Sequence, residues 1–67
     1  MKIIINDHTK EVAAQTTLAA FLREMGYKEF NGIALAVNRQ IIPKTSWESF
    51  ELKEQDNIIL FSATCGG

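Results

Sequence analysis

Cysteine is almost absent from the sequence, and the single Cys65 cannot form a disulfide within the chain. Small secreted domains usually depend on several disulfides. The sequence also lacks a run of about eighteen apolar residues, the length that a membrane-spanning helix needs. The opening MKIIIN is too short an apolar stretch for a secretory signal. We therefore expect a soluble protein of the cytoplasm.

An excess of positive charge is missing as well. Seven Lys and Arg residues are balanced by eight Asp and Glu residues, for a net charge of −1, and the basic residues are scattered along the chain. Nucleic-acid binding needs a basic patch that neutralises phosphates. The charge pattern therefore gives no indication of a nucleic-acid partner.

The sequence patterns of metal sites and of common active sites are missing too. His8 stands alone among turn residues, no C-x-x-C, P-loop or G-x-G-x-x-G motif occurs, and the carboxylates are spread singly. A chain of 67 residues forms one domain, and burying only about 60% of its surface leaves little room for an enclosed active site. We expect a solvated His8, no metal, no cofactor of the protein's own and no enzyme activity.

Short stretches rich in β-branched and apolar residues predict five strands. Turn residues separate them, and Pro43 ends one strand because proline cannot donate a ladder hydrogen bond. Residues 44–50 predict one short helical turn, and we expect Trp47 within it to fill one end of the core. The predicted strands are residues 2–6, 10–14, 33–38, 41–42 and 56–63.

One helix is predicted between the second and third strands. Either Thr16 or Thr17 can cap its first free N–H groups, and Gly26 suits the left-handed residue that ends a helix. Apolar residues recur at i, i+3, i+4 and i+7, which is the spacing of one helical face. We expect this whole stripe in the core: Leu18, Phe21, Leu22 and Met25.

The element order β-β-α-β-β-β predicts a two-layer α+β domain over residues 1–63, with one helix on one face of the sheet. Alternation along the last strand places Ile58 and Leu60 on one face and its other apolar residues on the opposite face. We predict that the first pair faces the helix. The other face then exposes an apolar patch, which usually marks a partner surface: Ile4, Ile59 and Phe61.

The sequence ends in FSATCGG, and we expect residues 64–67 to form a flexible tail. Cys65 has no fixed cation beside it in the sequence, so its thiol is expected to be only weakly activated. Gly66 and Gly67 carry no side chains, so the tail can present its carboxylate bare. Because Cys65 is only weakly activated, the carboxylate of Gly67 is the most promising reactive group.

Segments spread over nearly the whole chain carry a family resemblance. They are TTLAAFLREM at 16–25, ALAVNRQIIP at 34–43, Trp47, DNIILF at 56–61 and the final Gly66-Gly67. In this order and spacing they resemble the ThiS family, the sulfur carriers of thiazole formation in thiamine biosynthesis. The related MoaD family, the carriers for molybdopterin, is similar but normally longer. The resemblance implies the ubiquitin-like β-grasp fold, a mixed sheet with one main helix.

The resemblance also implies a reaction cycle at the tail. An E1-like adenylyltransferase of the ThiF type would use ATP and Mg²⁺ to adenylate the Gly67 carboxylate. A cysteine desulfurase or another sulfurtransferase would supply the sulfur for a thiocarboxylate, and a thiazole synthase of the ThiG type would accept that sulfur. The face formed by Ile4, Ile59 and Phe61 would then meet both the activating enzyme and the synthase.

Two positions depart from the family pattern, and three other functions stay open. Gln55 stands where the family usually has glycine before the last strand, and Cys65 stands beside the diglycine where we expect a small or aliphatic residue. The alternatives are a MoaD-like carrier for molybdopterin, a ubiquitin-like modifier that becomes attached to lysines, and a non-reactive β-grasp interaction module. Transfer of sulfur to the tail separates the carriers from the modifier and from the module.

Overall fold

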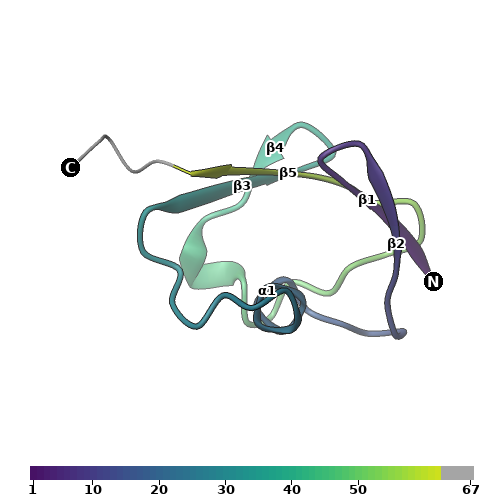
Figure 1. Cartoon of the computed structure of the whole chain (residues 1–67), viewed down its shortest axis with the longest axis horizontal. Helices are drawn as coiled ribbons and strands as arrows, with labels where there is room; N and C mark the ends of the chain where they lie inside the picture. The colour runs from purple at the N-terminus through teal and green to yellow at the C-terminus, as the bar shows by residue number, and fades with distance from the viewer. Residues whose placement is uncertain (63–67) are drawn as a thin grey trace.

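A computed structural model describes residues 1–62 of the chain, and its elements follow the predicted order β-β-α-β-β-β (Figure 1). The sheet lies above helix α1 and the short 3₁₀ helix in this view. The elements are β1 (Lys2–Ile5), β2 (His8–Glu11), α1 (Leu18–Glu24), β3 (Ile33–Val37), β4 (Gln40–Ile41), the 3₁₀ helix η1 (Lys44–Ser46) and β5 (Asn57–Ser62).

The strands form one mixed sheet in the order β2-β1-β5-β3-β4. β5 lies in the centre, where it runs parallel to β1 and antiparallel to β3. Ile58 is the register partner of Ile5 on one side and of Val37 on the other. Two tight antiparallel hairpins, β1–β2 and β3–β4, form the two sides of the sheet. The predicted mixed sheet with one helix is confirmed.

Helix α1 has a cap at each end. The Thr17 hydroxyl accepts a hydrogen bond from the N–H of Ala20 at 3.2 Å, which satisfies one of the free donors of the first turn. At the other end, Gly26 has φ +104° and its N–H donates to the carbonyl of Arg23, while the N–H of Tyr27 donates to the carbonyl of Leu22. These two bonds define a Schellman motif, which explains why the helix stops there.

The prediction that Met25 belongs to the core is wrong. Its side chain is 38% exposed, whereas the other three residues of the stripe are fully buried. The helix ends at Glu24, and Met25 is the C-cap residue. The chain therefore leaves the helical path toward Gly26 at the point where Met25 would have continued the apolar face.

The second strand begins earlier in the sequence than the pattern predicted. β2 spans His8–Glu11 rather than residues 10–14, because Asn6 and Asp7 both take positive φ, 47° and 70°. Positive φ at both central residues makes a two-residue type I′ turn, which matches the twist of a hairpin. His8 is exposed as expected, but it lies in β2 and not in the turn.

The core lies between the sheet and α1 and is closed at one end by Trp47, as expected. Trp47 is fully buried, and its indole N–H donates to the carbonyl of Ile42 at 2.8 Å. The Phe30 ring packs against it with centroids 5.3 Å apart. The carbonyl of Trp47 also accepts the N–H of Ala19 in the first turn of α1. The backbone and the side chain of Trp47, the C-cap residue of η1, thereby tie the start of the helix to the segment directly after β4.

The start of β5 is held by Asp56, which is buried although it is charged. Its carboxylate accepts the backbone N–H of Lys53 at 2.8 Å and the side-chain amide of Asn38 at 3.0 Å. The amide oxygen of Asn38 in turn accepts the N–H of Asn57 at 3.0 Å. These bonds fasten the β3–β4 turn to β5. Gln55, the departure from the family pattern, has φ 70° and adopts the backbone conformation that favours glycine.

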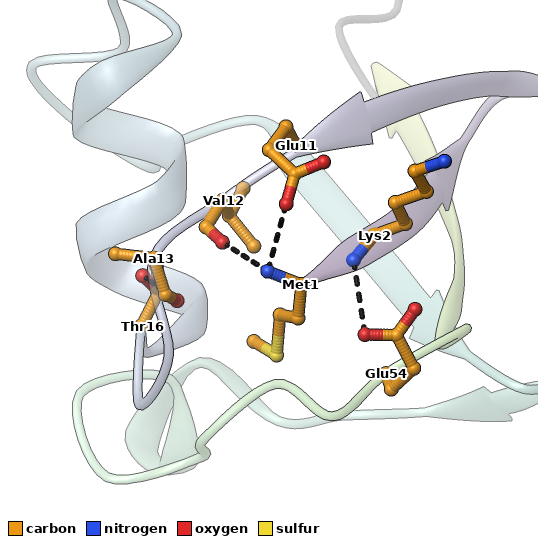
Figure 2. Close-up of polar contacts among 7 residues, drawn as sticks. All are labelled: Met1, Lys2, Glu11, Val12, Ala13, Thr16 and Glu54. Atoms are coloured by element: carbon orange, nitrogen blue, oxygen red, sulfur yellow. Dashed lines mark hydrogen bonds and ion pairs between the residues drawn. The ribbon is translucent and has the colours of Figure 1, made fainter.

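The beginning of β1 is fixed by polar contacts (Figure 2). The α-ammonium of Met1 donates to the Glu11 carboxylate at 2.9 Å and to the carbonyl of Val12 at 2.8 Å. The backbone N–H of Lys2 donates to the Glu54 carboxylate at 3.2 Å. The hydrogen bond from the ammonium lowers the pKa of Glu11. These contacts hold β1 to β2 and to the loop before β5.

Candidate functional site

The two faces of the sheet differ in what covers them. On the covered face, Ile3, Ile5 and Ile58 are buried against α1. On the open face, Ile59 and Phe61 are 41% and 45% exposed. The expected orientation of β5 is therefore confirmed, although Leu60 is only half-buried. The role of the open face in partner binding stays a prediction.

The large apolar residues of the open face extend over three strands, and they are exposed on two of them. Ile4 is half-buried on β1, and Ile59 and Phe61 lie on β5. Ile41 on β4 is 62% exposed and was missed by the sequence analysis. We call Ile4, Ile41, Ile59 and Phe61 the open-face patch.

The register explains how Ile41 joins this patch. Ala36 of β3 has Ile59 as its partner on one side and Ile41 on the other. Residues directly opposite one another in an antiparallel pair point to the same face, so the three side chains form one row across the sheet. The alternation of large and small residues in IALAV was the available signal, because it places the alanines of β3 on the open face.

A hollow of about 370 Å³ lies at the end of the patch near the β3–β4 turn. It is lined by Asn38, Arg39, Asn57 and Ile59. Asn38 and Arg39 form the turn itself, with φ 51° and 72°. The hollow therefore combines one apolar patch residue with a guanidinium and amide groups.

The predicted reactive residues Cys65, Gly66 and Gly67 lie outside the described residues, as does Ala63, the predicted last residue of the final strand. β5, which carries Ile59 and Phe61, ends at Ser62 and leads directly into this segment. The two patch residues of β5 therefore lie directly before this segment in the chain.

The described residues contain no candidate metal centre. Within residues 1–62, no group of three His, Cys, Asp or Glu side chains could hold a metal ion. In the same part of the chain, no helix is long and apolar enough to span a membrane.

The ion pair of Arg23 with Glu48 is exposed, and the hydrogen bond from Arg23 lowers the pKa of the Glu48 carboxyl. Both charges belong to a structural pair on the helix side of the sheet.

Comparison with solved structures defines the class of fold. A crystal structure of the thiamine biosynthesis protein ThiS from Geobacter metallireducens superposes with a TM-score of 0.85 over the whole of both chains, at 14% sequence identity. At that identity the likeness concerns the fold alone, and it places the chain among β-grasp proteins.

Sequence comparison identifies the family within that class. The ThiS family model matches residues 3–67, and the sulfur carrier protein ThiS of Escherichia coli (strain K12) is 34% identical over 67 residues, which cover both chains completely. The chain belongs to the ThiS family.

Proposed function

We propose that this chain is a cytoplasmic sulfur carrier for thiazole formation in thiamine biosynthesis, with Gly67 as the residue that carries the sulfur. The observation that carries the proposal is the full-length match to a sulfur carrier protein, in a family match that extends through Gly67. The open-face patch supports it, because a carrier must be held by its partners while its tail reacts. The protein is then a co-substrate and not an enzyme.

The chemistry follows from the poor reactivity of a carboxylate. The Gly67 carboxylate attacks the α-phosphate of ATP, pyrophosphate leaves, and an acyl adenylate forms. A cysteine persulfide on the sulfur-donating protein attacks the acyl carbon and displaces AMP. The product is an acyl disulfide, in which a new C–S bond joins Gly67 to the persulfide. A thiol then cleaves the S–S bond of this acyl disulfide, which leaves a thiocarboxylate on Gly67 and a disulfide between the thiol and the donor cysteine. The thiazole synthase takes the sulfur from this thiocarboxylate.

The division of labour between carrier and partner suits the residues present. The adenylyltransferase supplies ATP and Mg²⁺, which neutralises the phosphate charge during the transfer. Gly66 and Gly67 admit the backbone into a narrow site that excludes water. Ordering a free segment costs about 1–2 kcal/mol per residue, and apolar burial of the open-face patch in a complex offsets that cost. The patch is thus part of the function even though it performs no chemistry.

Intact mass tests the proposal. The protein is incubated with the activating enzyme, ATP and a sulfide source, and we expect one oxygen of the chain to be replaced by sulfur. Lysine-linked conjugates in cells, with no sulfur gain, would support a ubiquitin-like modifier instead. An unchanged mass would support a non-reactive interaction module.

Variants of the tail locate the chemistry. Deleting Gly67 should abolish the sulfur gain and leave the thermal unfolding curve unchanged, because the domain lies upstream. Cys65→Ala should keep nearly full sulfur transfer, because the partners supply the thiols. A deletion variant that gains sulfur at the wild-type rate would exclude Gly67 as the carrier residue.

Reconstitution separates the two carrier functions. Loaded protein is mixed either with thiazole synthase or with molybdopterin synthase that lacks its own carrier. We expect sulfur delivery only to the thiazole synthase, in keeping with the family. Delivery only to the molybdopterin enzyme would favour the MoaD-like alternative.

A further inference from the structure

The hollow beside the open-face patch contains donors that no neighbour uses. Within residues 1–62, neither the Arg39 guanidinium nor the side-chain amide of Asn57 has a hydrogen-bond or ion-pair partner. Asn38, in contrast, is engaged by Asp56 and by the backbone of Asn57. The hollow therefore holds a free cation and a free amide next to the apolar side chain of Ile59.

The backbone gives no reason for an arginine at this position. The second central residue of a type I′ turn is most often glycine, because φ is positive there. Arg39 has φ 72° and Asp7, its counterpart in the β1–β2 hairpin, has φ 70°. Glycine would suit both turns better than either side chain does. Backbone strain therefore does not distinguish the two residues, and what distinguishes Arg39 from Asp7 is its place in the lining of the hollow beside Ile59.

The groups in the hollow define the chemistry of what they bind. A guanidinium presents parallel N–H donors that match the two oxygens of a carboxylate, and the Asn57 amide can add a donor. Ile59 makes one wall apolar and continues into the open-face patch. A partner that matches this hollow presents an acidic side chain next to apolar side chains. We therefore expect the partner to be a protein.

We propose that Arg39, with Asn57, receives an Asp or Glu side chain of the activating enzyme when that enzyme docks on the open-face patch. This inference rests on the proposed function. The activating enzyme meets the carrier before sulfur is attached, when its tip is an ordinary glycine carboxylate. The body of the domain must therefore identify the carrier, and a charge at the edge of an apolar patch provides specificity and faster association.

The two hairpin turns supply a matched experiment. Arg39→Gly and Asp7→Gly each remove a charged side chain from the same turn position, and both should raise the midpoint of thermal unfolding. Affinity for the activating enzyme is measured by calorimetry in low salt, at about 0.05 M, and in high salt, at about 0.5 M. We expect Arg39→Gly to weaken binding by about tenfold in low salt, with a smaller effect in high salt. Asp7→Gly should bind within about twofold of the unchanged protein.

Charge reversal provides a second measurement. Arg39→Glu should weaken binding more than Arg39→Gly does, because two carboxylates would then face one another. Lys28→Glu makes the same charge change in the loop after α1, at an exposed residue remote from the hollow in the sheet, and should leave affinity within about twofold. Equal losses for Arg39→Glu and Lys28→Glu, or none for either, would overturn the inference.

The outcome can be distinguished from failure of the proposed function. If the unchanged protein gains sulfur but Arg39→Gly binds as tightly as Asp7→Gly, the inference about Arg39 is wrong and the carrier function stands. If the unchanged protein gains no sulfur with an active partner, the carrier function itself fails. An Arg39→Gly deficit that is the same in low and high salt would also contradict an electrostatic contact.

Discussion

Ile58 and Ile59 are chemically identical neighbours in the central strand, yet they have different surroundings. Ile58 faces α1 and is completely buried, whereas Ile59 lies on the open face among the residues of the patch. The alternation of a strand sends successive side chains to opposite faces. The covered face therefore supplies folding stability, while the open face leaves apolar surface exposed to solvent. Under the proposed function, one strand would serve stability and partner binding with the same residue type.

The largest expected effect comes from making the same substitution on each face. Ile58→Ala should lower the free energy of unfolding by about 2–5 kcal/mol, because it removes fully buried methyl groups and leaves a cavity. Ile59→Ala should lower it by less than about 1 kcal/mol, as exposed positions usually do. Chemical denaturation of the two variants measures both values. A greater loss for Ile59→Ala would show that the faces are assigned the wrong way round.

Truncating the aromatic residue of the patch should separate binding from stability. Phe61→Ala is expected to weaken affinity for the activating enzyme by about 1–3 kcal/mol, as loss of an aromatic hot spot does, with little change in unfolding. Ile41→Ala asks whether β4 belongs to the same surface, and it should also weaken binding. Titration calorimetry with both variants measures this. Unchanged affinity for Phe61→Ala would remove the open-face patch as the docking site.

A change at the entrance to β5 should alter stability without altering docking. Gln55 has positive φ, and a non-glycine residue there costs about 1–2 kcal/mol. Gln55→Gly should therefore raise the free energy of unfolding by about 1 kcal/mol. Gln40→Gly is the matched control, because Gln40 lies in β4 and glycine weakens strands. A lowered denaturation midpoint for Gln55→Gly would show that its side chain contributes more than its backbone costs.

The smallest expected effects concern two ion pairs, Met1 with Glu11 at the start of the sheet and Arg23 with Glu48 beside the helix. The pKa values of Glu11 and Glu48 lie below the ordinary value of 4.5, because each accepts a hydrogen bond from a cation. A lowered folded-state pKa stabilises the fold above the unfolded value, and that contribution is lost as pH falls through the folded pKa. Stability should therefore decline below about pH 4.5, slightly less so in Glu11→Gln and Glu48→Gln. Unfolding curves at a series of pH values measure the decline in stability for each protein. If both variants lose as much stability as the unchanged protein does, other carboxylates account for the acid sensitivity.

Local signals in the sequence were sufficient for the elements and for the orientation of β5. A threonine cap at 16 or 17 and the glycine at 26 predicted the limits of α1, and alternation along β5 predicted which residues face the helix. Each of these signals involves neighbours in the chain and a single physical rule. Trp47, large and isolated in a small domain, was likewise predicted to lie in the core.

The predictions that failed concern positions whose structure depends on backbone geometry, and the spacing of apolar residues in the sequence does not contain that geometry. Met25 has the right spacing for the core, but the cap geometry at Gly26 turns the chain away. The tight turn at Asn6 and Asp7 shifted β2 toward the first strand, since Asp at the second position is an uncommon signal for a type I′ turn. Ile41 was missed because β4 has two residues, and two residues show no alternation. Arg39 was not identified from the sequence, because the hollow that it lines exists only in the folded structure.

The central position of β5 also governs how the domain can fold during synthesis. Among the described strands β5 is made last, yet it forms the bonds that join the β1–β2 hairpin to the β3–β4 hairpin. Contacts between residues far apart in sequence form late, because their loops must close first. A nascent chain that lacks β5 has two separate hairpins and no complete sheet. Ile59 and Phe61 therefore become part of a shaped surface only once β5 has been made and has paired with both hairpins, so the proposed docking surface cannot form on a shorter nascent chain.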